Sequence, residues 1–274
     1  MARAHLSCYV SPARSAARPL DSVVLSPNDR LHMEFSGFSP GALRFLRDLA
    51  RNNRREWFET HRAVYEAEVR QPLLALLDEL DVRLGTLAPE LAADPKRSVF
   101  RIYRDVRFSK DKSPYKTHAA LWIYHRAPGR GVGKEIDGGA GFYVHLEPNA
   151  SLVAAGLWMP PRPSLAKVRE HFSEDLAGWK RAVTAPAVLK RFGGLTDDED
   201  GILLKRLPRG FEEGHPAERW LRFNSFTMHR GYSDADMMSP KLADKAMKDF
   251  ALLVPMARWL NRALGYLPAK SRLG

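Results

Sequence analysis

The spacing of the apolar residues changes several times along the chain, and this change constrains the fold more than any other feature. Between residues 40 and 85, leucines and other apolar residues recur mostly every three or four positions, as in amphipathic helices. Between about 100 and 159, apolar residues alternate with polar ones or form short runs bounded by Pro and Gly, as in strands. The helical spacing returns at 163–179 and 239–264. This order predicts an α+β fold: a mainly antiparallel sheet with N-terminal and C-terminal helices packed on it.

Local signals give the expected ends of these elements. Ser39 and Pro40 are suited to the cap and first turn of a helix, and Gly85 is suited to the end of a helical stretch. Pro148-Asn149 predicts a hairpin turn between two strands. We expect strands at 100–108, 119–125, 141–147, 151–159, 203–211 and 221–229.

Composition limits the class of protein and its partners. The chain has 274 residues with 43 Lys and Arg against 32 Asp and Glu, a net charge of +11. This charge favours anionic partners such as phosphates or nucleic acid, although a solvated Arg-rich surface gives the same number. No apolar run approaches the roughly 20 residues of a membrane span, so we expect no membrane partner. Cys8 is the only cysteine, which excludes an intramolecular disulfide and favours a cytoplasmic location.

The two ends of the chain differ from its centre. Residues 1–33 are rich in Ala, Ser and Arg and have no sustained apolar stretch, while patterned sequence starts directly after Met33. We expect residues 1–33 to be a disordered tail or a start-site artefact. The expected single globular domain covers 34–268, followed by a short tail at 269–274.

Residues 98–117 combine basic and aromatic side chains more densely than any other stretch. We expect an anionic ligand to bind here; the candidate residues are Arg101, Arg104, Arg107, Lys110, Lys112, Tyr115 and Lys116. Read as a strand, the segment places Arg104 on an apolar face, where its permanent charge needs an anionic partner. That partner is either an internal carboxylate, such as Glu56, Asp105 or Asp111, or a phosphate or carboxylate of a ligand.

The turn at residues 109–114 follows this expected strand. Its two lysines, two serines and free backbone N–H groups are suited to phosphate, although a solvated turn explains the same composition. Tyr103 and Tyr115 are suited to stacking on a planar ligand or to packing in the core.

Other common catalytic motifs are absent from the sequence. The stretch from Gly129 to Lys134 is not a phosphate-binding Walker loop, because Pro128 replaces its first glycine and Glu135 replaces the required Ser or Thr. It is either a hairpin connection or a mobile lid over an anion site. We find no Gly-x-Ser-x-Gly nucleophile motif.

The histidines do not have a diagnostic spacing for metal ligands. His145 and Glu147 share an expected strand face with Tyr143, while His118 and His125 flank another strand. We therefore expect no metal site and identify no cofactor. If the protein performs acid–base chemistry, the candidates are Tyr143, His145 and Glu147.

Several longer motifs resemble those of domain-of-unknown-function family 2461, found in bacteria and fungi. They are Phe35-Ser-Gly-Phe38, Asn52-Asn53, Trp57-Phe58, the Arg101–Thr117 segment with its Arg-Asp-x-Arg-Phe-Ser-Lys-Asp-Lys core, Gly156-Leu-Trp-Met-Pro160, Pro208-Arg-Gly-Phe211 and His215-Pro216. The resemblance extends over about residues 34–265. It implies one domain in which residues 104–116 are a hallmark, and it implies no activity.

Three hypotheses of function therefore stay open. In the first, the basic segment binds a phosphate-bearing small molecule, with or without an enzymatic reaction. In the second, it forms a nucleic-acid-binding surface together with Lys205, Arg206 and Arg209. In the third, its cations only close internal salt bridges in a structural or interaction protein.

Overall fold

The centre of the fold is one antiparallel sheet of five strands. The computed structural model describes residues 34–107, 109–130, 138–197 and 201–270. The strands follow each other across the sheet in chain order, and every neighbouring pair is antiparallel. They are β1 (Leu91–Ala92), β2 (Ala119–His125), β3 (Gly141–Leu146), β4 (Ser151–Leu157) and β5 (Phe226–Tyr232). The predicted α+β class, with a mainly antiparallel sheet, is confirmed.

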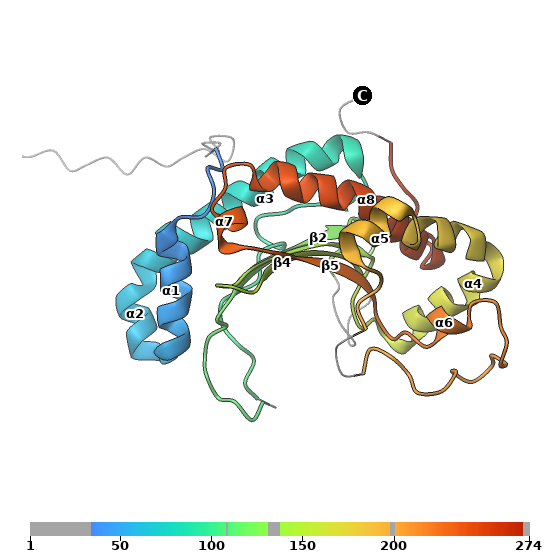
Figure 1. Ribbon diagram of the computed structural model, residues 1–274. Helices are drawn as coiled ribbons and strands as arrows, with labels where there is room; N and C mark the ends of the chain where they lie inside the picture. Colours follow the sequence, from blue (N-terminus) through green and yellow to red (C-terminus); the bar gives the residue numbers. More distant parts are fainter. Residues whose placement is uncertain (1–33, 108, 131–137, 198–200, 271–274) are drawn as a thin grey trace, which may run out of the picture. The chain divides into compact units, whose positions relative to one another are not determined.

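Helices precede, interrupt and follow the strands. They are α1 (Pro40–Arg51), α2 (Arg55–Val64), a π-helical turn (Tyr65–Arg70), α3 (Gln71–Leu87), α4 (Arg162–Val183), α5 (Pro186–Phe192), α6 (Glu218–Leu221), α7 (Asp234–Met237) and α8 (Leu242–Ala263). Figure 1 shows α3, α5 and α8 lying over one face of the sheet. N-terminal and C-terminal helices thus cover the same face, as the sequence predicted.

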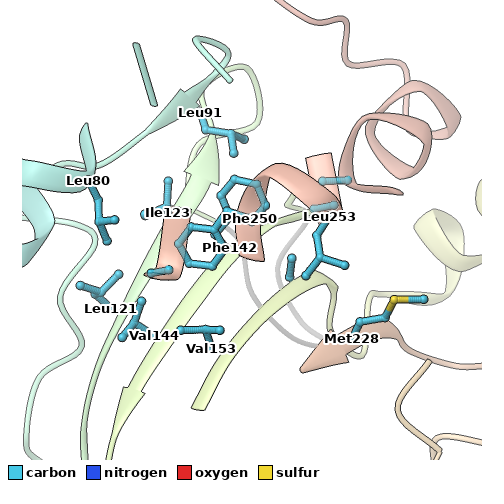
Figure 2. Close-up of a cluster of buried hydrophobic side chains, with 14 of the residues drawn as sticks. Leu80, Leu91, Leu121, Ile123, Phe142, Val144, Val153, Met228, Phe250 and Leu253 are labelled. Carbon is cyan, nitrogen blue, oxygen red and sulfur yellow. The ribbon is translucent and has the colours of Figure 1, made fainter. Parts of the chain in front are cut away.

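Side-chain alternation along β3 builds the core. Phe142, Val144 and Leu146 are fully buried on the helical side. The ring of Phe142 stacks on Phe250 of α8 with centroids 4.4 Å apart, as Figure 2 shows among the surrounding aliphatic side chains. Because side chains alternate between the faces of a strand, the intervening Tyr143 points to the opposite face.

Two buried polar side chains connect α8 to the sheet. The Asn261 amide accepts a hydrogen bond from the Ala140 N–H (2.8 Å) and donates one to the Ala140 carbonyl (3.1 Å), just before β3. The Asp249 carboxylate accepts from Arg191 Nε (2.5 Å) and from the Tyr232 hydroxyl (2.7 Å). Both groups are almost fully buried, so loss of a partner would leave an unpaired polar group inside the protein.

The expected strand at 100–108 is wrong in its described part, residues 100–107. The segment is extended only in places and forms isolated bridges at Val99 and Tyr103. Instead of following β2 along its length, it folds back on itself: the Lys116 N–H bonds to the Ile102 carbonyl and the Arg104 N–H to the Pro114 carbonyl. The return of the chain through the 109–114 turn supplies the pairing that a neighbouring strand would have supplied.

Three element boundaries also differ from expectation. Residues 203–211 are not a strand and make one isolated bridge, at Leu203, because Pro208 and Gly210 interrupt the extended backbone. The expected strand at 221–229 starts only at Phe226, since α6 extends to Leu221 and residues 222–225 form a turn with an isolated bridge at Phe223. Gly85 lies inside α3, where it is buried, and does not end it.

Some predictions lie outside the described residues. These are the tail at 1–33, residue 108 of the expected first strand, residues 131–137 of the glycine-rich stretch, and residues 271–274 of the expected C-terminal tail. Within the described helices, none has the combination of length and apolar character needed to cross a bilayer.

Replacement of Phe142 by Ala tests the contact between the sheet and α8. We expect the free energy of unfolding to fall by about 3–5 kcal/mol, because the change leaves a cavity against Phe250. Val82→Ala, at a side chain 59% exposed on α3, is the control and should change it by less than about 0.5 kcal/mol. Urea denaturation measures both, and equal effects of the two substitutions would contradict this account of the core.

Candidate functional site

A pocket of about 530 Å³ lies on the sheet face opposite α3, α5 and α8. It is lined by Phe100, Trp122, Tyr143, His145, Leu152, Ala154, Ala155, Trp158, Thr196, Thr227 and His229. Three strands and the segment before β2 contribute aromatic side chains, while β4 contributes small ones. The lining is largely apolar with a few polar groups, which is typical of small-molecule sites.

The register of the strands explains why this face is hollow. Trp122, Tyr143, Ala154 and His229 lie opposite one another in one row across β2 to β5. The small side chain of Ala154 stands between larger ones on both sides. The small side chain at Ala154 therefore leaves a hollow in this row, and the aromatic and imidazole side chains on either side form its walls.

Gly156 shapes the end of β4 and places Trp158 at the pocket. Its φ of +129° lies in a region that side chains rarely allow, and a Cβ there would approach the Phe226 carbonyl oxygen to 2.0 Å. Two residues later, on the same face of the extended chain, Trp158 is 46% exposed and lines the pocket. A large exposed aromatic side chain beside a pocket is available to a ligand.

The indole N–H of Trp122 is a free donor beside the pocket. The side chain is 5% exposed, yet Nε1 has no hydrogen-bond partner among the described residues. Buried N–H groups are rarely unpaired, so an acceptor from a bound molecule is a physical reason for this one.

Two cations lie against the Phe100 ring, which forms one wall of the pocket, and the charge of a third, Arg101, acts on one of them. Lys116 Nζ lies 5.1 Å from the ring centroid and the guanidinium carbon of Arg130 lies 4.5 Å from it. Burial, and then the charges of Arg101 and Arg130, lower the pKa of Lys116 below its ordinary value. The charges of Arg101 and Arg130 therefore disfavour the protonated form of Lys116.

No carboxylate of the described residues forms a salt bridge with these three cations. Burial also lowers the pKa of Arg130, and its Nε atom is buried without a hydrogen-bond partner in the described part of the chain. Since a guanidinium keeps its charge, such a cluster gains most from an anion supplied by a ligand.

The other cations of the basic segment have internal partners. Arg104 pairs with Asp111 and Arg107 pairs with Asp105 (2.7 Å), the latter carboxyl having its pKa lowered to about 2 by this contact. Lys112 Nζ donates to the Val106 carbonyl (2.9 Å). These three side chains satisfy groups within their own loop, as the internal alternative for Arg104 predicted.

Two further candidates from the sequence, Lys110 and Tyr115, differ in their exposure to solvent. Lys110 is exposed at the turn. Tyr115 is 1% exposed and stacks on Phe58 of α2 with centroids 4.2 Å apart, so it packs in the core. Of the seven candidates, Lys116 thus lies against the Phe100 wall of the pocket, beside Arg130, and the charge of Arg101 acts on Lys116.

Asn53, between α1 and α2, holds the basic segment in place. Its amide donates to the Tyr115 carbonyl (2.9 Å) and accepts from the Tyr115 N–H (3.0 Å). This two-bond clamp fixes the residue that directly precedes Lys116. The N-terminal helices therefore position the cation that faces the pocket.

An imidazole and carboxylate cluster lies beside the cations. Ligand atoms of His118, His145 and Glu147 are all within 4.8 Å of one another. The Tyr143 hydroxyl bonds to His145 Nδ1 (2.9 Å), and His145 Nε2 bonds to Glu147 Oε2 (2.9 Å). The chain of bonds can relay a proton, and the three ligand atoms can hold a cation.

Strand pairing creates this cluster from residues distant in sequence. Ala119 pairs with Leu146, which places His118 beside Glu147 on the pocket face. The pKa of His118 is lowered to about 4 by burial and by the neighbouring His145, so this imidazole is neutral at neutral pH. His125, the other histidine flanking β2, is buried and stacks on Tyr266.

A family model described as "Conserved hypothetical protein (DUF2461)" matches residues 41–259, most of the chain. The chain belongs to the DUF2461 family. No curated protein and no solved structure matches it. The DUF2461 resemblance predicted from the sequence is confirmed, and it assigns no activity.

Three residues of the motifs typical of DUF2461 have clear structural roles in this chain. Asn53 clamps the basic segment, Gly156 allows the close approach of β5, and Trp158 lines the pocket. Sequence reasoning did not single out Trp122, Thr196, Thr227 or His229, because their roles depend on strand register. The spacing of Trp122 within an alternating strand was the only local signal.

Replacement of Asn53 by Ala should loosen the basic segment without unfolding the domain. We expect a loss of about 1–3 kcal/mol in stability, since the backbone groups of Tyr115 lose both partners. Hydrogen exchange of residues 101–117 should become faster than in the Asn52→Ala control, because the side-chain amide of Asn52 donates to the Asp48 carbonyl at its own helix end and not to the basic segment. Unchanged exchange at Tyr115 would show that the clamp is dispensable.

Proposed function

We propose that the pocket on the open sheet face binds a small anionic ligand, best a phosphate-bearing one. Lys116, Arg101 and Arg130 hold the anion, and the aromatic walls hold an apolar or planar part of the molecule. The observation that carries this proposal is that Lys116 and Arg130 lie against Phe100 with no salt-bridge partner among the described residues, beside a pocket of ligand size.

Binding of an anion stabilises the cation cluster more than hydration alone does. Lys116 has a lowered pKa because burial and two like charges oppose its protonated form. A bound phosphate would replace this repulsion by attraction and by charge-assisted hydrogen bonds, which are about twice as strong as neutral ones. Phosphate suits the cluster because its oxygens accept bonds from several donors at once.

The pocket lining supports a ligand with a body beyond its anion. Trp122 and Trp158 offer ring faces, and the Trp122 N–H lacks a partner in the described part of the chain. Aromatic side chains contribute about 1–3 kcal/mol per stacked ring in nucleic-acid and nucleotide recognition. An anion joined to a planar group uses both halves of the site.

This proposal accounts for the basic residues better than a nucleic-acid surface does. The basic segment pairs with β2 near one edge of the sheet, through Val99, whereas Leu203, just before Lys205 and Arg206, pairs beside the start of β5 at the other edge. Figure 1 shows the corresponding loops at opposite ends of the sheet. A continuous basic stripe joining them is not favoured by this arrangement.

The test compares two lysines of the same segment. Wild-type protein is screened by thermal shift with inorganic phosphate, pyrophosphate and a set of nucleotides, and affinities of responding compounds are measured by calorimetry. We expect Lys116→Met to weaken binding at least about 10-fold, since a charge-assisted bond contributes about 1.5–3 kcal/mol. Lys110→Met removes the same charge from an exposed position and should change affinity less than about 2-fold.

The pH dependence of ligand affinity, measured in the same calorimetry experiment, tests the role of Lys116 a second time. An ordinary lysine has a pKa of about 10.4. Because the pKa of Lys116 is lowered, Lys116 loses its charge in the free protein at a lower pH than an ordinary lysine does. Affinity should therefore fall as pH rises, and Lys116→Met should remove this dependence. Equal losses in both lysine variants, or no response to any compound, would overturn the proposal.

A further inference from the structure

We propose that His118, His145 and Glu147 form a binding site for one divalent transition-metal ion of the zinc class. Two neutral imidazoles and one carboxylate are a ligand set used by zinc in proteins, with further positions open to water or substrate. The three ligand atoms already lie within 4.8 Å of one another. In a tetrahedral site with bonds near 2.0–2.1 Å, ligands are about 3.4 Å apart, so modest side-chain rotation completes the set.

The backbone holds these residues in a favourable arrangement. His145 and Glu147 are two residues apart at the end of β3, and His118 enters from the start of β2 on the same face. Rings of the two histidines lie 4.3 Å apart. Ligands on paired strands are positioned more rigidly than ligands on loops.

Groups outside the cluster orient two of the ligands. When the ion occupies His145 Nε2, the proton resides on Nδ1 and is donated to the Tyr143 hydroxyl, 2.9 Å away. Glu147 Oε1 accepts a bond from the Thr117 hydroxyl (3.4 Å), which leaves Oε2 beside His145. Such supporting bonds accompany protein metal ligands and fix their orientation.

His118 supports this inference over a purely structural hydrogen-bond network. Its ring makes no hydrogen bond with any described residue, although it is partly buried against His145. A neutral imidazole with free lone pair is the form that binds metals. The open side of the cluster faces the pocket, which His145 lines.

The neighbouring cations make the metal and anion sites distinguishable. The positive charge of Lys116, two residues before His118 in the chain, repels a positive ion at this cluster. Lys116→Met should therefore weaken phosphate binding and leave metal affinity equal or higher. Glu147→Gln should do the opposite, since it removes a metal ligand and a negative charge near the anion. Failure of one proposal is thus separable from failure of the other.

The experiment uses the full chain after chelator treatment and dialysis. Zn²⁺ is titrated by calorimetry in a buffer without phosphate, and Co²⁺ serves as a spectroscopic probe through its visible absorption. We expect one equivalent to bind in the wild type, with affinity reduced at least about 100-fold in Glu147→Gln, beyond the 10–100-fold typical of supporting residues. Tyr143→Phe keeps all ligands and should weaken binding about 10-fold with unchanged stoichiometry.

The matched control is Glu174→Gln. Glu174 contacts His171 at 2.5 Å on α4, so this pair copies the His–Glu contact without a third ligand within reach among the described residues. Its substitution should leave metal affinity unchanged. Circular dichroism with chelator present confirms that each variant is folded. Fewer than one equivalent in the wild type, or equal affinity in Glu147→Gln and Tyr143→Phe, would overturn the metal site.

Discussion

Side-chain alternation on β3 is the constraint on which the rest of the structure depends. Phe142, Val144 and Leu146 face the helices, and the residues between them face the pocket. A shift of the strand by one residue would place Tyr143 and His145 in the core and the apolar set in solvent. The burial of the core therefore fixes the register that creates the candidate site, and the two cannot vary independently.

The helical layer makes this open face a rigid platform. Asn261 bonds to both backbone groups of Ala140 and so fixes the chain where β3 begins. Asp249 joins α8 to α5 and, through Tyr232, to the end of β5. These polar contacts are directional, unlike the apolar packing around them, and hold strands and helix in one relative position. The same contacts therefore fix the positions of the strands that line the pocket on the opposite face.

The sequence predicted what depends on local periodicity and failed where pairing is nonlocal. Strands β2, β3 and β4 were predicted within two residues, because alternation and the Pro148-Asn149 turn are local signals. The basic segment was misread as a strand because no local pattern reveals that its residue 102 pairs with 116. The meeting of His118 with His145 likewise depends on strand register, so residue spacing alone could not predict a cluster there.

Electrostatics links the two proposed binding events within one pocket. Arg101 and Arg130 repel the positive charge of Lys116, and Lys116 also opposes positive charge at His118. An anion placed between them and the His118–His145–Glu147 cluster would be attracted by the cations and by a metal ion at once. Each partner would then raise the affinity for the other, since coupling between binding sites is reciprocal. A phosphate-bearing molecule that also coordinates a metal ion would satisfy both proposed sites, because Lys116 and the His118–His145–Glu147 cluster are close together in the chain fold.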